Sequence, residues 1–329
     1  MHKSTTDKGL NKMIDRPQVL GIDIGGTNTK FGLVDEKGTI TKFKKIATNT
    51  ENGNLPAFLD QLIFESKRLL NHLDIVPLGI GLSLLGWLND ERTYTLFSMN
   101  SPSLNGYDLK ALFEGEFKLP AILNEDLVAH NLAEYYWGSG RGYDRFLILA
   151  MGTGVGASMM IKGKPLKFTG GCAGDTGHII LRPDGPPCPE GCCGCGEAFI
   201  GTPNIERLAI QKYGSSLRAS EVIRKARDQS DSIAIDIIKE IGMYTGELLA
   251  SLTPIFLPSR ICLTGGTAKS GTILLEATKA RFEELAGRYQ RNCTAYSCGY
   301  YQGVDIVLSE LPGETGVLGS VVEFFMDRS

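Results

Sequence analysis

The sequence predicts an α/β protein built from two similar lobes. The chain has 329 residues, which is more than one domain of about 150 residues needs. Each half opens with strands around a glycine turn and then alternates helices with strands. This pattern is typical of a mixed sheet with helices on its faces. Together, these observations indicate a duplicated architecture with a cleft between the lobes.

The first lobe is expected to begin with three consecutive strands. Residues 19–24 form an apolar run, and residues 30–34 and 39–46 complete a pattern of three strands, separated by a Gly-Gly pair and by a polar turn. Pro56 suits the first turn of a helix, and apolar residues at near-helical spacing carry that helix to about Leu70. The elements expected next are a strand at 77–82, a helix at 108–117, a strand at 121–123 and a helix at 126–137.

The second lobe is expected to repeat this opening. Strands at 145–151 and 155–161 flank the turn Gly152-Thr153-Gly154, and a third strand is expected at 178–181. Apolar residues three and four apart over 233–252 predict a long amphipathic helix. The remaining expected elements are a strand at 260–263, a helix at 273–285, a strand at 304–308 and a closing helix at 316–325.

The expected domains follow from these elements. Residues 1–18 are polar and mixed in charge and are expected to form a flexible arm. Residues 19–136 with 314–329 should form a smaller lobe, and residues 137–313 a larger lobe. The arm lacks the features of a signal peptide, and no apolar run reaches the roughly 18 residues of a membrane span, so a cytoplasmic location is expected.

The charge balance excludes some classes of partner. Lys and Arg number 34 against 37 for Asp and Glu, which gives a formal net charge of -3. Without an excess of basic charge, neither nucleic acid nor a membrane surface is expected as the main partner. Hydrophobic residues make up 42% and charged residues 22% of the chain, as in an ordinary globular protein.

Three glycine turns follow expected strands. Gly25 and Gly26 come after the first strand, where backbone N–H groups can approach a phosphate while Asp23 reaches toward a bound magnesium ion. Taken alone, this segment is interpreted equally well as a glycine-rich hairpin turn. Similar turns occur at 152–154 and 265–266 in the second half. Three such turns favour a triphosphate nucleotide held between the lobes.

The cysteines indicate a metal site. Four of the eight, Cys188, Cys192, Cys193 and Cys195, fall within eight positions, a density that suits a metal-binding loop better than disulfides. The alternative is a group of buried thiols in a glycine-rich loop. The other four are expected to be free thiols.

The combination of motifs resembles a known family. The three glycine turns, Asn124-Glu125-Asp126, the segment 174–178 and the cysteine cluster are similar to those of the ROK family of repressors and sugar kinases. The match spans about residues 19–325 and implies a duplicated actin-like ATPase (ribonuclease H-like) fold. It also implies magnesium-dependent transfer of a phosphoryl group from ATP to a hexose, with glucose as the expected substrate. The nucleotide-binding residues that the resemblance implies are Asp23, Gly25, Gly26, Thr27, Asn28, Lys30, Gly152, Thr153, Gly154, Gly265 and Gly266.

The resemblance also assigns a catalytic base. Asp126 stands where the family has the Asp that accepts the proton of the attacking sugar hydroxyl. Taken alone, an Asp at the start of a helix is interpreted more simply as a residue that stabilises the helix N-terminus. The sugar contacts that the resemblance implies are Asn124, Glu125, Asp175, His178 and Glu197.

Two of these residues depart from the family pattern. Glu125 stands where the family usually has Asn, and Asn124 lies one position earlier, so the sequence leaves open which side chain meets the sugar. Asp175 stands where the family often has Glu. Its side chain is one methylene shorter, which bears on which hexose fits.

A structural zinc ion is also implied by the resemblance. His178, Cys188 and Cys195 have the family's spacing, but Glu190 occupies the position of a further cysteine. Because tetrahedral zinc needs a fourth ligand, we favour Cys193, with Cys192 as the alternate. The zinc ion would orient His178 and hold the loop that carries Glu197.

Other functions remain open at this stage. A sugar-sensing transcription regulator of the same family is not favoured, because the 18 residues before the first strand show no helix-turn-helix pattern. Fructose, N-acetylglucosamine and N-acetylmannosamine kinases are alternatives that the sequence does not separate. A homodimer or homotetramer is expected from the resemblance alone.

Overall fold

The protein folds into two compact units. The structure is a computed structural model that describes residues 16–51, 54–71, 73, 76–98, 101–168, 174–311 and 313–326. Residues 1–15 of the predicted arm lie outside this description, and Gln18 already begins the first strand. The first unit comprises Met1–Trp137, Lys167–Cys172 and Glu314–Ser329, and the second comprises Gly138–Leu166 and Ala173–Gly313.

The first unit is built on a five-stranded mixed sheet with the order β3-β2-β1-β4-β7. Strands β1, β2 and β3 form an antiparallel meander, and β4 and β7 continue the sheet parallel to β1. Every residue of β1 is buried, as expected for a central strand that is covered on both faces. The strands are β1 (Gln18–Ile24), β2 (Asn28–Asp35), β3 (Ile40–Ala47), β4 (Ile80–Leu84) and β7 (Ala121–Glu125), with a separate hairpin of β5 (Trp87–Leu88) and β6 (Thr95–Phe97).

Glycines let one helix of this unit pack directly on the sheet. A Cβ on Gly81 would lie 2.0 Å from the carbonyl oxygen of Ser320, and one on Gly319 would lie 1.6 Å from that of Ala129. Helix α10 therefore contacts both β4 and α4 backbone to backbone. The helices of the unit are α2 (Leu55–Leu70), α3 (Leu109–Phe117), α4 (Asp126–Trp137), α10 (Thr315–Val321) and α11 (Glu323–Met326).

The second unit repeats the topology of the first. Its sheet has the order β10-β9-β8-β11-β12, with an antiparallel meander of β8, β9 and β10 followed by β11 and β12 parallel to β8. The two sheets therefore agree strand for strand, and the predicted duplicated α/β fold is confirmed. The strands are β8 (Arg145–Met151), β9 (Val155–Ile161), β10 (Lys164–Pro165), β11 (Arg260–Thr264) and β12 (Asp305–Leu308).

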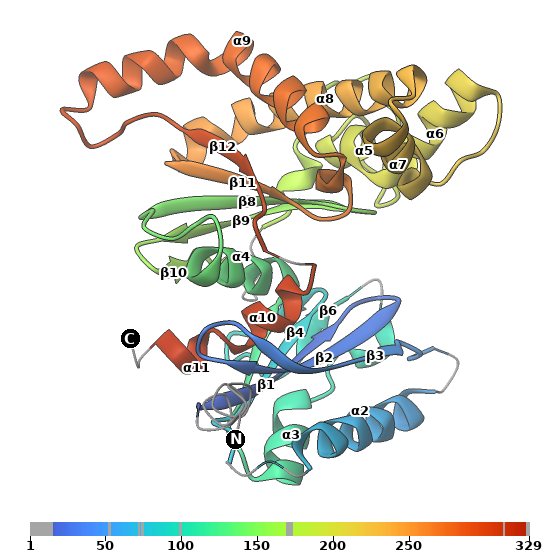
Figure 1. The fold of residues 1–329 in the computed structure, drawn as a ribbon, viewed down its shortest axis with the longest axis vertical. Coiled ribbons are helices and arrows are strands. Elements are labelled where there is room, and N and C mark those ends of the chain that lie inside the picture. The colour runs from blue at the N-terminus through green and yellow to red at the C-terminus, as the bar shows by residue number, and fades with distance from the viewer. Residues whose placement is uncertain are drawn as a thin grey trace, which may run out of the picture. The chain divides into compact units, whose positions relative to one another are not determined.

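Two long helices pack against each other in the second unit. Helices α8 (Ser232–Phe256) and α9 (Thr272–Tyr296) lie side by side (Figure 1). A Cβ on Gly246 of α8 would lie 2.7 Å from the carbonyl oxygen of Thr278, so glycine permits the close contact. Although each helix has 25 residues, neither they nor any other helix in the described part of the chain combines the length and apolarity needed to span a bilayer.

Some sequence-based predictions fail in this unit. The strand expected at 178–181 is wrong, because Thr176–His178 form a 3₁₀ turn, η3, and only Ile180 makes an isolated bridge, to Cys195. Helix α9 continues eleven residues beyond the predicted end at residue 285. The chain also forms α5 (Gly196–Ile200), α6 (Thr202–Tyr213), α7 (Ala219–Gln229) and the 3₁₀ turn η4 (Thr267–Ser270), none of which was predicted.

Candidate active site

Asp23 lies near the end of β1, against the start of α10. Its side chain is buried, with Lys30 Nζ 3.8 Å from its carboxylate, and the same Nζ lies 3.2 Å from the carboxylate of Glu314. A Cβ on Gly316 would lie 2.4 Å from the Asp23 carboxyl carbon, so this contact requires glycine. Asp23 and Glu314 share Lys30 as an ion-pair partner. Carboxylate oxygens such as those of Asp23 are the ligands that Mg²⁺ prefers.

The first glycine turn connects β1 to β2. Gly25 N donates to Asn28 O at 3.2 Å, and Thr27 O accepts from Thr48 N at 3.0 Å, so the backbone forms a true hairpin turn. Gly26 and Thr27 are exposed at its tip, where a ligand can reach their backbone. The two interpretations of this segment are therefore compatible.

Asp126 follows β7 directly and begins α4. Part of its surface remains exposed, yet burial among protein groups, reinforced by the negative charge of Asp23, raises its pKa to about 7. A hydrogen bond from the backbone of Leu127 opposes this rise. An ordinary Asp is fully ionised at pH 7, whereas this one takes up and releases a proton near neutral pH, as a general base must.

His130 lies one helical turn after Asp126, on the same face of α4. Its Nδ1 is 2.9 Å from Thr315 Oγ1, a hydrogen bond that ties α4 to the start of α10. Burial lowers the pKa of His130, although the charge of Asp23 opposes this effect. The sequence interpretation gave His130 no role, although its four-residue spacing from Asp126 places both residues on one face of the helix.

The strand β7 ends in two polar residues with different environments. Asn124 is fully buried, and its Oδ1 accepts from Arg92 Nη1 at 3.0 Å. Arg92 also donates to both carboxylate oxygens of Glu323, at 2.8 and 2.9 Å. Burial lowers the pKa of Lys167, as does Arg92, whereas Glu323 and Glu125 act in the opposite direction. Asn124 thus takes part in an internal network through its Oδ1, and Glu125 beside it is also buried.

The second and third glycine turns meet in the second unit. A Cβ on Gly265, which follows β11 with a φ of +90°, would lie 2.5 Å from the carbonyl oxygen of Met151, just before Gly152. By contrast, a Cβ on Gly152 or Gly266 would have open space around it. The third turn therefore packs on the second, and both leave room for close approach of a ligand to the backbone.

The predicted sugar-binding loop is fastened to β9. Thr176 Oγ1 accepts from Ala157 N at 2.7 Å, and a Cβ on Gly177 would lie 1.8 Å from the carbonyl oxygen of Val155. His178 follows directly, and its backbone N donates to Asp175 O at 3.0 Å. The Asp175 side chain is exposed, so its carboxylate is accessible to a ligand.

Glu197 lies in the first turn of α5, beside the second glycine turn. Its Oε2 accepts from Val155 N at 3.0 Å, and a Cβ on Gly154 would lie 3.0 Å from the same oxygen. This carboxylate therefore links the loop that follows the cysteines to the turn at 152–154, and one of its oxygens is already occupied.

The cysteine cluster and His178 form a candidate metal centre. The ligand atoms of His178, Cys188 and Cys192 lie within 4.8 Å of one another, and Cys188 Sγ is 3.8 Å from His178 Nδ1. Zinc–sulfur bonds of about 2.3 Å in tetrahedral geometry place ligand atoms roughly 3.8 Å apart, so the spacing fits Zn²⁺. Cys195 is fully buried against Cys188, and burial raises its pKa to about 11. As a ligand, it would have to release that proton.

The geometry favours the alternate ligand, Cys192, over Cys193. Cys188 N donates to Cys192 O at 2.7 Å across a tight turn, and Cys193 pairs with Pro187. Consecutive side chains of an extended segment point to opposite sides, so Cys192 faces Cys188 while Cys193 is exposed. The structure brings together the ligand atoms of His178, Cys188 and Cys192, and Cys195 packs beside Cys188.

The duplicated sheets define an actin-like α/β fold, with a glycine turn after the first strand of the sheet in each unit. The chain belongs to the ROK family, whose model matches residues 19–322. It is 32% identical over 294 residues to a glucokinase of Halalkalibacterium halodurans, covering 83% of this chain and 87% of that one.

Solved structures of the family agree with this assignment. A ROK family glucokinase from Streptomyces griseus in complex with glucose and AMPPNP is 27% identical, covers 92% of this chain and 97% of its own, and has a TM-score of 0.75. A ROK hexokinase from Thermus thermophilus is 26% identical, covers 94% of this chain and 99% of its own, and has a TM-score of 0.76.

Proposed function

We propose that this protein transfers a phosphoryl group from ATP to a hexose hydroxyl, with glucose as the substrate. The observation that carries the proposal is Asp126, whose pKa of about 7 suits it to accept the hydroxyl proton. The similarity of this chain to a glucokinase, over most of both chains, supports the choice of sugar.

The nucleotide would be held by backbone and by two charged residues. The exposed turn at Gly26 and Thr27 and the open positions at Gly152 and Gly266 let phosphate or base approach closely. Asp23 would hold the magnesium ion, which neutralises the negative charge of the transferred group. Lys30 would turn from its ion pairs toward the phosphates.

Asp126 would act on the sugar from the N-terminus of α4. Its ionised form accepts the proton of the attacking hydroxyl, and the nearby charge of Asp23 makes that ionised form a stronger base. Glu125, Asp175, His178 and Glu197 would accept or donate hydrogen bonds with the remaining hydroxyls. Each bond that a wrong sugar leaves unmade costs binding energy, which gives selectivity.

The zinc ion would have a structural role. The ligand set of His178, Cys188, Cys192 and Cys195 fits it, and the ion would fix the ring of His178 and the loop that leads to Glu197. The protein's own residues would carry out the proton transfer, and zinc would affect the reaction only by positioning those residues.

A coupled ATP-consumption assay over a panel of hexoses tests the proposal. Glucose should give the highest kcat/KM among glucose, fructose, mannose, N-acetylglucosamine and N-acetylmannosamine. The variant Asp126→Asn should lower kcat by about 10²- to 10⁴-fold, the usual contribution of a general base. Full turnover by this variant would overturn the assignment of the base.

The second candidate is a kinase for an N-acetylhexosamine or fructose. Asp175 and Glu125 differ from the usual family residues, and both can alter which hydroxyl arrangement is satisfied. The same panel decides between the candidates, because a different best sugar would replace glucose without removing the phosphoryl transfer.

A further inference from the structure

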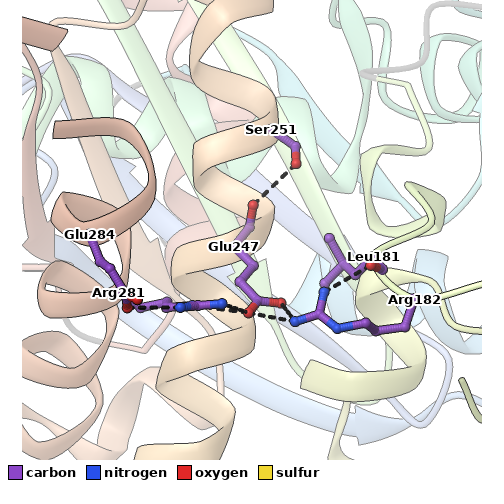
Figure 2. A network of polar contacts seen from close by, with 6 residues as sticks. All are labelled: Leu181, Arg182, Glu247, Ser251, Arg281 and Glu284. Carbon is purple, nitrogen blue, oxygen red and sulfur yellow. Dashed lines mark hydrogen bonds and ion pairs between the residues drawn. The ribbon is translucent and has the colours of Figure 1, made fainter. Parts of the chain in front are cut away.

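A buried carboxylate joins three separate segments of the second unit. Glu247 on α8 is 7% exposed, and its Oε1 accepts from Arg182 Nη2 at 2.7 Å and from Arg281 Nη2 at 2.6 Å. Arg281 belongs to α9 and also donates to Glu284 at 2.7 Å. Figure 2 shows the two guanidinium groups meeting the carboxylate from opposite sides.

Arg182 belongs to the loop that carries the candidate metal-binding cysteines. Its backbone N and that of Leu181 both donate to Gly194 O, at 3.0 and 2.8 Å. A Cβ on Gly194 would lie only 1.5 Å from the carbonyl oxygen of Arg182. Because Gly194 directly precedes Cys195, the backbone of Arg182 is in direct contact with the cysteine segment.

The neighbouring residue of α8 contacts the same loop. A Cβ on Gly196 would lie 3.1 Å from Leu248 Cδ2, so Leu248 packs against the residue between Cys195 and Glu197. Two consecutive residues of α8 therefore hold the loop, Glu247 by charge and Leu248 by packing. This arrangement fixes the positions of the buried Cys195 thiol and the Glu197 carboxylate relative to α8.

We propose that Glu247 and Arg182 are positioning residues that anchor the metal and sugar loop, residues 182–197, to α8. Arg281 keeps the Glu247 carboxylate compensated and oriented from the other side, on α9. The effect on sugar binding rests on the proposed function, whereas the effect on the loop and its metal does not. Glu247 and Arg182 would affect zinc and sugar binding only by positioning the residues of this loop.

The variant Arg182→Gln separates the anchor from the fold. Arg182 is half-exposed, and without it Glu247 is still paired with Arg281, so the core should remain intact. A matched control is Lys212→Gln, which removes another ion pair to α8, that between Lys212 and Glu240 at 3.1 Å, away from the loop. Glu247→Gln provides a second, independent loss of the anchor.

Hydrogen exchange of the loop amides tests the anchor without reference to activity or metal. The amides of Leu181, Arg182 and Gly194 should exchange about fivefold to tenfold faster in Arg182→Gln and Glu247→Gln. The Lys212→Gln control should match wild type. Unchanged exchange at these amides in both anchor variants would overturn the proposal.

Metal retention and steady-state kinetics then show what the anchor positions. Both anchor variants should lose zinc to a chelator about fivefold faster and raise the KM for the sugar several-fold, while the KM for ATP and kcat change less than twofold. Equal changes in both KM values, or wild-type zinc loss with faster loop exchange, would overturn the positioning role. Absence of any hexose phosphorylation would refute the proposed function and leave the exchange and zinc measurements to decide on the anchor.

Discussion

Replacing Asp126 by Asn is expected to make the protein more stable at neutral pH while removing its base. The environment of Asp126 raises its pKa from 3.8 to about 7, chiefly by burial. In the unfolded chain the same group ionises near its ordinary value. Keeping the carboxylate charged in the folded protein at pH 8 therefore costs free energy, and an uncharged amide avoids that cost.

The magnitude follows from the difference in pKa. The pKa of Asp126 is higher by about three in the folded protein, and a pKa difference of one corresponds to about 1.4 kcal/mol. The upper limit of the cost is therefore about 4 kcal/mol. Because Asp126 keeps part of its surface in water, we expect about half of this, or about 2 kcal/mol. The folded state holds the proton to a higher pH than the unfolded chain, so this cost is absent below pH 4, grows between pH 4 and 7, and is complete above pH 7.

Urea unfolding of both proteins at pH 5 and pH 8 measures this effect. Asp126→Asn should be the more stable protein at pH 8 by about 2 kcal/mol, and its advantage should shrink by about 1 kcal/mol at pH 5. The control Asp60→Asn makes the same chemical change at an exposed position of α2 and should show no such pH dependence. A variant less stable than wild type at pH 8, or an advantage that grows toward acid, would refute the reasoning.

Three further predictions test individual contacts. Cys192→Ser should reduce bound zinc to less than half of one equivalent, whereas Cys193→Ser should retain it; metal analysis showing the reverse would contradict the choice of Cys192 as a ligand. Gly316→Ala should cost more than about 2 kcal/mol in urea unfolding, since its Cβ would collide with a buried carboxylate, whereas Gly313→Ala has open space and should be near neutral. His130→Ala should cost about 1 kcal/mol by removing one hydrogen bond between α4 and α10, and an unchanged unfolding midpoint would exclude that contact.

The fold could be predicted from local patterns because the two halves repeat the same signals. The turn at Gly25-Gly26 and the turn at 152–154 each follow a strand that pairs antiparallel with the next one, as the structure shows. The segment at 178–181 has the composition of a strand, but hydrogen bonds to Gly194, outside that segment, hold its end as a loop. Local propensity does not report such a distant partner.

The details of the site depended on contacts that sequence spacing does not encode. The contact between Asn124 Oδ1 and Arg92, which lies about thirty residues earlier in the chain, is one that no local pattern predicts. The choice between Cys192 and Cys193 follows from which side of a tight turn each thiol faces. Both features depend on contacts that only the folded chain provides.

The pH dependence of kcat/KM for the best hexose tests the central claim most directly. If Asp126 is the base, kcat/KM should be level above about pH 7 and fall tenfold for each pH unit below it, since only the ionised carboxylate accepts the hydroxyl proton. A profile that stays level down to pH 5 would contradict the account, because no group titrating near neutrality would then be needed for catalysis.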